Sequence, residues 1–148
     1  MHIPADYLAL ARTYDGTYAP SLLHKLTHCP YPFVWQALAA NPLTPPTTLL
    51  DLTKAQDSAW NDNRLLHLLA DHPRADLYVL RAVLTATATK LAAGQRPYAA
   101  ALALTARPEL APDAFRHLGA LPGASRRFRH GLTRRLNHSS VLWIRAQP

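Results

Sequence analysis

Cysteine and glycine are scarce in this sequence of 148 residues, and each shortage excludes a class of structure. Cys29 is the single cysteine, so one chain forms neither an internal disulfide nor a cluster of metal-binding thiolates. Glycine, which hairpin turns and bulges require, occurs five times, whereas proline occurs 13 times. Because proline ends helices and also occupies their first position, this balance favours many short helices over a sheet.

Long apolar runs and catalytic signatures are also missing. The most apolar stretch, residues 98–106, is far shorter than the roughly 20 residues that a membrane-spanning helix needs. No secretion signal is visible at the N-terminus, so we expect a cytoplasmic protein that does not bind membranes. Neither a Gly-x-Ser-x-Gly nucleophile motif nor a Gly-x-x-x-x-Gly-Lys-Ser/Thr phosphate loop is present. We therefore predict no catalytic residues, no cofactor and no enzymatic activity.

The composition is that of a folded helical domain. Apolar residues make up 49% of the chain and charged residues 17%, which is enough apolar material for one core. Leucines recur at helical spacing, as in Leu65, Leu66 and Leu69, and no segment alternates polar and apolar residues for the length of a strand. We predict a single all-α domain over residues 1–148, with its longest helix at residues 77–91.

A corner built around proline stands out in residues 34–50. Asn41 precedes Pro42 and closes one helix, because the residue before a proline avoids the α conformation. Thr44 is then expected to cap the next helix, and Pro45 to occupy its first position, where no amide donor is needed. The segment thus predicts the end of one helix, a tight corner and the start of another.

The same order of residues recurs along the chain. Copies follow at Pro73 and Pro108, a looser one opens at Pro20, and a degenerate one has Leu136 in place of the proline. The slots at positions 42, 73, 108 and 136 are 31, 35 and 28 residues apart, the length of two short helices. We predict a short α-solenoid of about four to five helical hairpins, with helix starts near Pro20, Pro45, Asp76, Pro112 and Ser139.

Apolar side chains occupy equivalent positions in these units. A single hairpin cannot bury its apolar face, so neighbouring hairpins must stack. We expect one continuous core that contains Leu38, Leu49, Leu69, Leu80, Leu104, Phe115 and Leu132.

The corner at residues 37–49 also resembles a known family. The run Ala-Leu-Ala-Ala-Asn-Pro at residues 37–42, followed by Thr44-Pro45-Pro46 and Leu49, is similar to the leucine-rich repeat variant family, a superhelical relative of HEAT and armadillo proteins. The resemblance implies a solenoid that serves as a binding scaffold and has no catalytic residues. Some members carry an iron–sulfur cluster on clustered cysteines, which Cys29 alone cannot provide within one chain.

Two short segments resemble functional sites. His24 and His28 stand four residues apart beside Cys29, a spacing that places two imidazoles on one helix face, but Cys29 points about 100° away from His28 and we expect no metal site. Residues 57–64 combine acids with Trp60, as in HEAT-like DNA glycosylases, which use an acid and aromatic residues. In the simpler interpretation Trp60 packs on the core and Asp62 caps the following helix.

The C-terminal third is strongly basic. Residues 1–96 hold eight Lys and Arg against seven Asp and Glu, whereas residues 97–148 hold eight Arg against two acids, so the latter segment provides +6 of the net charge of +7. At 100° per residue, a helix over residues 126–136 gathers basic side chains on one side and Phe128, Leu132 and Leu136 on the other. The predicted nucleic-acid-binding residues are Arg126, Arg127, Arg129, His130, Arg134 and Arg135.

Three functional hypotheses follow from these patterns. The first is a non-enzymatic helical-repeat module that binds the backbone of DNA or RNA through the basic C-terminal surface. The second is a protein–protein interaction scaffold of a cytoplasmic complex, whose concave face carries the specificity. The basic face then binds an acidic partner or only aids solubility. The third is a HEAT-like DNA glycosylase.

Overall fold

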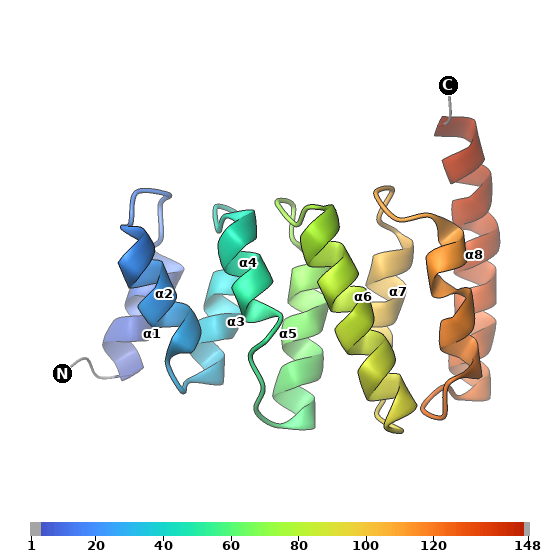
Figure 1. The fold of residues 1–148 in the computed structure, drawn as a ribbon, viewed down its shortest axis with the longest axis horizontal. Coiled ribbons are helices and arrows are strands. Elements are labelled where there is room, and N and C mark those ends of the chain that lie inside the picture. Colours follow the sequence, from blue (N-terminus) through green and yellow to red (C-terminus); the bar gives the residue numbers. More distant parts are fainter. Residues whose placement is uncertain (1–3, 147–148) are drawn as a thin grey trace.

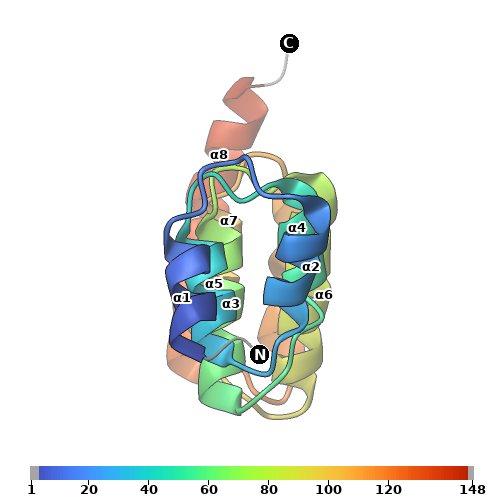
Figure 2. The same cartoon turned by 90° about the vertical axis from the view of Figure 1, so that its left-hand side faces the viewer.

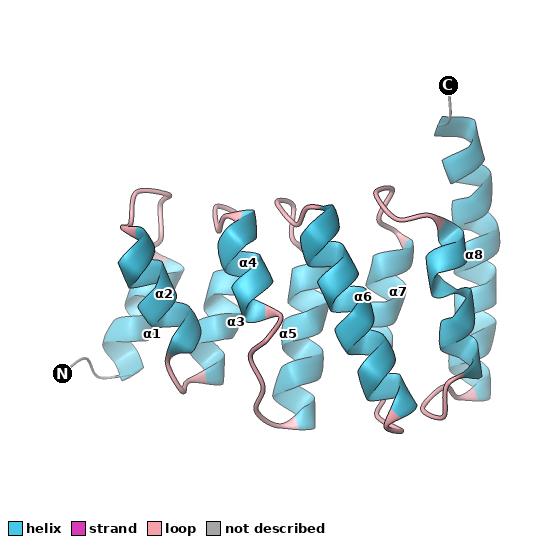
Figure 3. Ribbon diagram, in the orientation of Figure 1, coloured by secondary structure: helices cyan, strands magenta, loops and turns pink. Residues whose placement is uncertain are grey.

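The structure, a computed structural model, describes residues 4–146, and within this range it holds helices and loops but no strand. The all-α prediction is therefore confirmed for the described residues (Figures 1 and 3). None of the helices in this range has the length and apolar character needed to cross a membrane. In chain order the helices are α1 (Pro4–Arg12), α2 (Pro20–His28), α3 (Pro32–Ala40), α4 (Pro46–Leu52), α5 (Ala59–Asp71), α6 (Leu77–Ala92), α7 (Tyr98–Thr105), the 3₁₀ helix η1 (Pro112–Ala120) and α8 (Arg126–Ala146).

The helices alternate between two layers. Helices α1, α3, α5 and α7 pack side by side in one layer, while α2, α4 and α6 pack side by side in the other. Figure 2 looks along the stack and shows the two layers as two columns. Helix α8 closes the C-terminal end against both η1 and α7, and its last turns extend past the ends of the other helices (Figure 1).

Prolines and one aspartate set the helix starts. Helix α2 begins at Pro20, α4 begins directly after Pro45, and η1 begins at Pro112. Helix α6 follows Asp76, whose carboxylate accepts a hydrogen bond of 3.0 Å from the backbone N–H of Val79. Four of the five predicted starts are thus confirmed, because each depends on the local chemistry of the first helical turn.

The fifth start, at Ser139, is wrong. Ser139 lies inside α8, which runs without a break for 21 residues and is therefore longer than the predicted longest helix at α6. Leu136 holds the place that proline has in the other units, but leucine keeps its backbone N–H and does not clash with the preceding turn. The last unit is consequently one long helix rather than a hairpin.

Thr44 is also not the cap that the sequence predicts. Pro45 is the N-cap of α4, and Pro46 occupies its first position. The buried hydroxyl of Thr44 instead donates a hydrogen bond of 2.7 Å to the carbonyl of Leu38 in the preceding helix. Thr44 therefore satisfies a carbonyl at the end of α3 instead of an amide at the start of α4.

One continuous core runs through the described part of the chain. All seven side chains predicted for it are no more than 3% exposed, and all belong to a single apolar cluster. This expectation is confirmed, because the helical spacing of these residues places them on the faces that turn toward the neighbouring helices.

Side chains that precede the corner prolines link each corner to the one before it. Asn41 donates to the carbonyls of Ala11 and Tyr14, at 3.2 and 2.9 Å. His72 in turn contacts the carbonyl of Asn41 through Nε2 at 2.7 Å, and Arg107 donates to the carbonyl of His72 at 2.9 Å. The residue before each proline thus has a repeated structural role along the stack.

Asn41 and His72 use the same pair of hydrogen bonds. Asn41 accepts from the backbone N–H two residues later with Oδ1, and His72 accepts from the N–H of Arg74 with Nδ1, each at 3.0 Å. Since Nδ1 accepts, the neutral imidazole carries its proton on Nε2 and donates it to the carbonyl of Asn41. Burial, with the nearby charges of Arg74 and Arg107, lowers the pKa of His72 below its ordinary value.

Acid is therefore expected to destabilise the fold through His72. Below the ordinary histidine pKa of about 6.5, the unfolded chain takes up a proton that folded His72 resists, so the stability falls with pH until the folded-state pKa is passed. His72→Asn keeps one donor and one acceptor, as Asn41 does, but does not titrate. Urea unfolding between about pH 7.5 and 5.5 should show a shallower loss of stability for His72→Asn than for the wild type. If the two proteins lose equal stability over this pH range, titratable groups other than His72 cause the acid sensitivity.

Candidate nucleic-acid interface

Helix α8 is fixed at its start by the turn that precedes it. The hydroxyl of Ser125 accepts a hydrogen bond of 3.1 Å from the backbone N–H of Phe128. Tyr98 of α7 donates its hydroxyl hydrogen to the carbonyl of Gly123 and accepts from the N–H of Ser125. The rings of Tyr98 and Phe128 stack with their centroids 4.4 Å apart. Helix α7 thus determines where α8 begins and how it is rotated.

The apolar side of α8 packs inward. Phe128, Leu132 and Leu136 are all buried and belong to the core cluster. This matches the helical pattern predicted from the sequence, in which these three residues share one side.

The basic side of α8 faces solvent. The structure places all six predicted side chains on the exposed surface: Arg126, Arg127, Arg129, His130, Arg134 and Arg135. Arg129 and Arg135 are tied to the protein, since they donate to the carbonyls of Ala124 and Leu102 at 3.2 and 3.3 Å. The rest lie along the solvent side of the helix.

No ion pair within the described residues neutralises this basic surface. The two acids of the C-terminal third are engaged elsewhere: Glu109 pairs with Arg107 at 2.8 Å, and Asp113 pairs with Arg116 at 2.6 Å. Among the residues that the structure describes, no carboxylate forms an ion pair with an arginine of α8. The surface therefore presents uncompensated positive charge to solvent.

His24, His28 and Cys29 do not converge on one point. The two imidazole rings stack 3.9 Å apart on the exposed side of α2. Cys29 is buried, its thiol donates to the carbonyl of Leu26, and burial raises the pKa of the thiol. Over the described part of the chain, no group of three His, Cys, Asp or Glu side chains is arranged to hold a metal ion.

The structure differs from the simpler interpretation of residues 57–64. Trp60 is 71% exposed and does not pack on the core. Asp62 lies in the first turn of α5 but is not the cap, because Ser58 takes that position and accepts from the N–H of Asn61.

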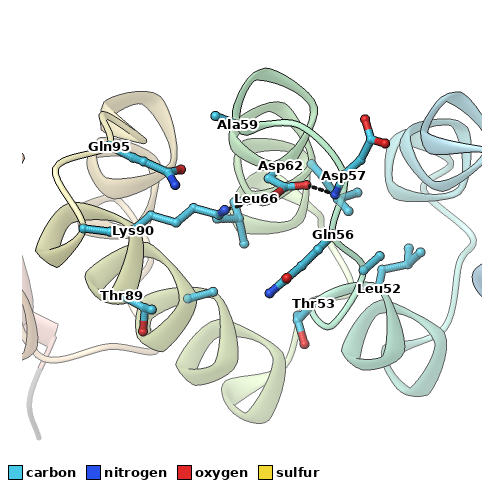
Figure 4. A pocket seen from close by; sticks show the side chains of 14 residues that line it. Leu52, Thr53, Gln56, Asp57, Ala59, Asp62, Leu66, Thr89, Lys90 and Gln95 are labelled. Atoms are coloured by element: carbon cyan, nitrogen blue, oxygen red, sulfur yellow. Dashed lines mark hydrogen bonds and ion pairs between the residues drawn. The ribbon is translucent and has the colours of Figure 1, made fainter.

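Asp62 lines a cavity of about 480 Å³ between the α4–α5 loop, α5 and α6 (Figure 4). Its carboxylate accepts hydrogen bonds from the N–H of Asp57 at 2.7 Å and from Nζ of Lys90 at 3.1 Å. Trp60 lines a different cleft, together with Arg64 and residues 96–99. Asp62 and Trp60 therefore line different hollows of the structure.

The structure also has a second group of basic residues, which the sequence analysis did not find. Arg12, Arg64 and Arg96 stand apart in the sequence, yet they line clefts on the outer surface of the α1–α3–α5–α7 layer. The one available signal is that Arg64 and Arg96 are 32 positions apart, close to the repeat length.

Comparison with known proteins found no relative of this chain. No family model matches the chain, and no curated protein or solved structure matches it either.

Proposed function

We propose that this chain is a short solenoid of helical hairpins, related to the leucine-rich repeat variant and HEAT-like families, that binds DNA or RNA without enzymatic activity. The repeated proline corners, the two layers of helices and the hydrogen bonds between successive corners support the solenoid. The hydrophobic core accounts for the buried face of each hairpin and leaves the outer faces for binding.

The observation that carries the nucleic-acid proposal is the absence of any counter-charge on α8. Arg126, Arg127 and Arg134 are exposed and have no ion-pair partner among the described residues. Like charges close together on a helix repel by a few tenths of a kcal/mol per pair, and exposed ion pairs contribute little to stability. Folding therefore gives no reason for this concentration of arginine, whereas a phosphate backbone neutralises it and releases counterions.

The expected mode of binding is contact with the backbone. Guanidinium groups donate two parallel hydrogen bonds to phosphate oxygens, and such contacts carry no sequence information. Helix α8 lies at the C-terminal end of the row of helices (Figure 1), and its arginines are exposed, so a long ligand can reach them. Binding is expected to be micromolar at low salt and largely independent of sequence.

A salt titration tests the proposal. The triple variant Arg126→Ala, Arg127→Ala, Arg134→Ala should reduce the log–log salt slope on duplex DNA by two to three units, about 0.9 for each lost phosphate contact. The charge-matched control replaces three exposed cations on other elements, Lys25, Lys54 and Arg81, with Ala and should change the slope by less than about one unit. Fluorescence anisotropy of a labelled oligonucleotide measures both.

Two outcomes contradict the proposal. If the wild type retains neither duplex nor single-stranded nucleic acid at about 50 mM salt, the protein–protein scaffold takes its place. If alkylated DNA gains abasic sites in the presence of the protein, the glycosylase hypothesis takes its place.

A further inference from the structure

The layer formed by α1, α3, α5 and α7 has an outer surface that α8 does not cover. Two clefts lie on it: one of about 230 Å³ between α5 and the start of α7, and one of about 540 Å³ across α1, α3 and α5. Arg64 lines both clefts, so they adjoin on the two flanks of α5. Together they form one surface, here called the α5 surface.

Positive charge dominates the α5 surface. Arg64 and Arg96 line the smaller cleft, Arg12 lines the larger one, and neither lining contains Asp or Glu. Arg64 donates through Nε to the Oε1 atom of Gln36 at 3.2 Å, which leaves its terminal nitrogens for a ligand. No carboxylate in the described part of the chain pairs with these three arginines. A ligand with complementary charge would therefore be an anion.

Aromatic side chains accompany the charge. Trp60 in the smaller cleft is 71% exposed, and Phe33 in the larger cleft is 43% exposed. The polar side chain of Asn63 also lines the smaller cleft. One exposed aromatic residue is ordinary on a protein surface, but here an exposed π-face shares one cleft with two arginines that form no ion pair with any described residue.

We propose that the α5 surface binds single-stranded nucleic acid, with a base stacked on Trp60 and neighbouring phosphates bound by Arg64 and Arg96. A single strand offers both features at once, because its bases are free to stack and its phosphates are free to pair with cations. A duplex conceals the faces of its bases inside the stack.

This site shares no residue with the basic side of α8. The proposed ligand is again a nucleic acid, as in the proposed function. The observations that support this second site are separate from those on α8, because they concern other helices and an exposed aromatic residue. The two surfaces therefore predict different responses to single-stranded and duplex ligands.

The test compares Trp60→Ala with the wild-type chain, using labelled oligothymidylate and a labelled duplex at about 50 mM salt. Removal of a stacking aromatic typically weakens binding about fivefold to a hundredfold, so we expect a loss of this size for oligothymidylate and no change for the duplex. Trp60→Phe keeps a π-face and should retain most of the affinity. The matched control is Tyr78→Ala, which removes an aromatic residue that is 73% exposed on α6, in the opposite layer.

A second measurement addresses the arginines. Arg64→Gln and Arg96→Gln should each lower the salt slope for the single strand by about 0.7, whereas Arg81→Gln on α6 should not. Oligothymidylate should also quench tryptophan emission in the wild type, and this quenching should disappear in Trp60→Phe.

The outcomes separate this proposal from the one for α8. If Trp60→Ala binds oligothymidylate as tightly as the wild type does, the inference about the α5 surface is overturned, whatever the result for the α8 triple variant. Loss of duplex binding in the α8 variant, with the Trp60 effect intact, supports both surfaces. Binding of an acidic peptide that depends on Arg64, without binding of oligothymidylate, would also overturn the inference and identify a protein ligand.

Discussion

Replacing Gly123 with alanine is expected to destabilise the protein by about 3 kcal/mol or more, at or beyond the upper end of the usual cost of overpacking. A Cβ at this position would lie 2.2 Å from the carbonyl oxygen of Gln95 and 2.8 Å from that of Leu91. Both obstacles are backbone atoms, one in the last turn of α6 and one in the loop after it, so no side chain can rotate away. The turn before α8 would have to move and would strain the hydrogen bond of 2.7 Å from the Gly123 N–H to the Leu91 carbonyl.

Gly131 provides the matched control. It lies inside α8, and a Cβ there meets nothing within 4 Å. Since glycine in a helix interior is less favourable than alanine by about 0.5–1 kcal/mol, Gly131→Ala should stabilise the protein by that amount. Urea unfolding of the two variants should therefore shift in opposite directions. A Gly123→Ala variant that unfolds at the wild-type midpoint would show that the turn is not packed against α6 as described.

The success and failure of sequence reasoning depend on how local each signal is. The starts of α2, α4, α6 and η1 follow from prolines or from Asp76, because the first turn of a helix is decided by the residues within it. The start expected at Ser139 rested on the repeat spacing and on a serine as the cap, with no proline to end the preceding helix. The repeat spacing alone did not predict a helix start here, because Leu136 replaces the proline that ends the helix in the other copies.

The two surfaces show the same contrast. The side of α8 that faces solvent could be predicted, since Phe128, Leu132 and Leu136 reveal the buried side of a single helix. The cleft that contains Trp60 and Arg96 could not, because these residues come from different helical units and meet only after the layers have packed. Likewise, nothing local shows that His72 and Arg107 reach back to the preceding corners.

Truncation of a core side chain is expected to lower the stability of the protein. Leu69 of α5 is fully buried, and α5 packs against α3, α6 and α7. Leu69→Ala should therefore cost about 2–5 kcal/mol, from lost burial and from the cavity that rigid neighbours leave unfilled. The control, Leu43→Ala, truncates a leucine that is 46% exposed at a corner and should change stability by less than about 0.5 kcal/mol.

The unfolding transition of Leu69→Ala carries further information. In a stack of helical hairpins each unit contacts only its neighbours, so a weak central unit threatens the coupling between the two ends. The chain of hydrogen bonds from Tyr14 through Asn41 and His72 to Arg107 spans this weakened point. We therefore expect Leu69→Ala to unfold in one transition, with circular dichroism and tryptophan emission changing together. Two separated transitions would mean that the corner hydrogen bonds do not couple the hairpins, and that the halves on either side of α5 fold independently.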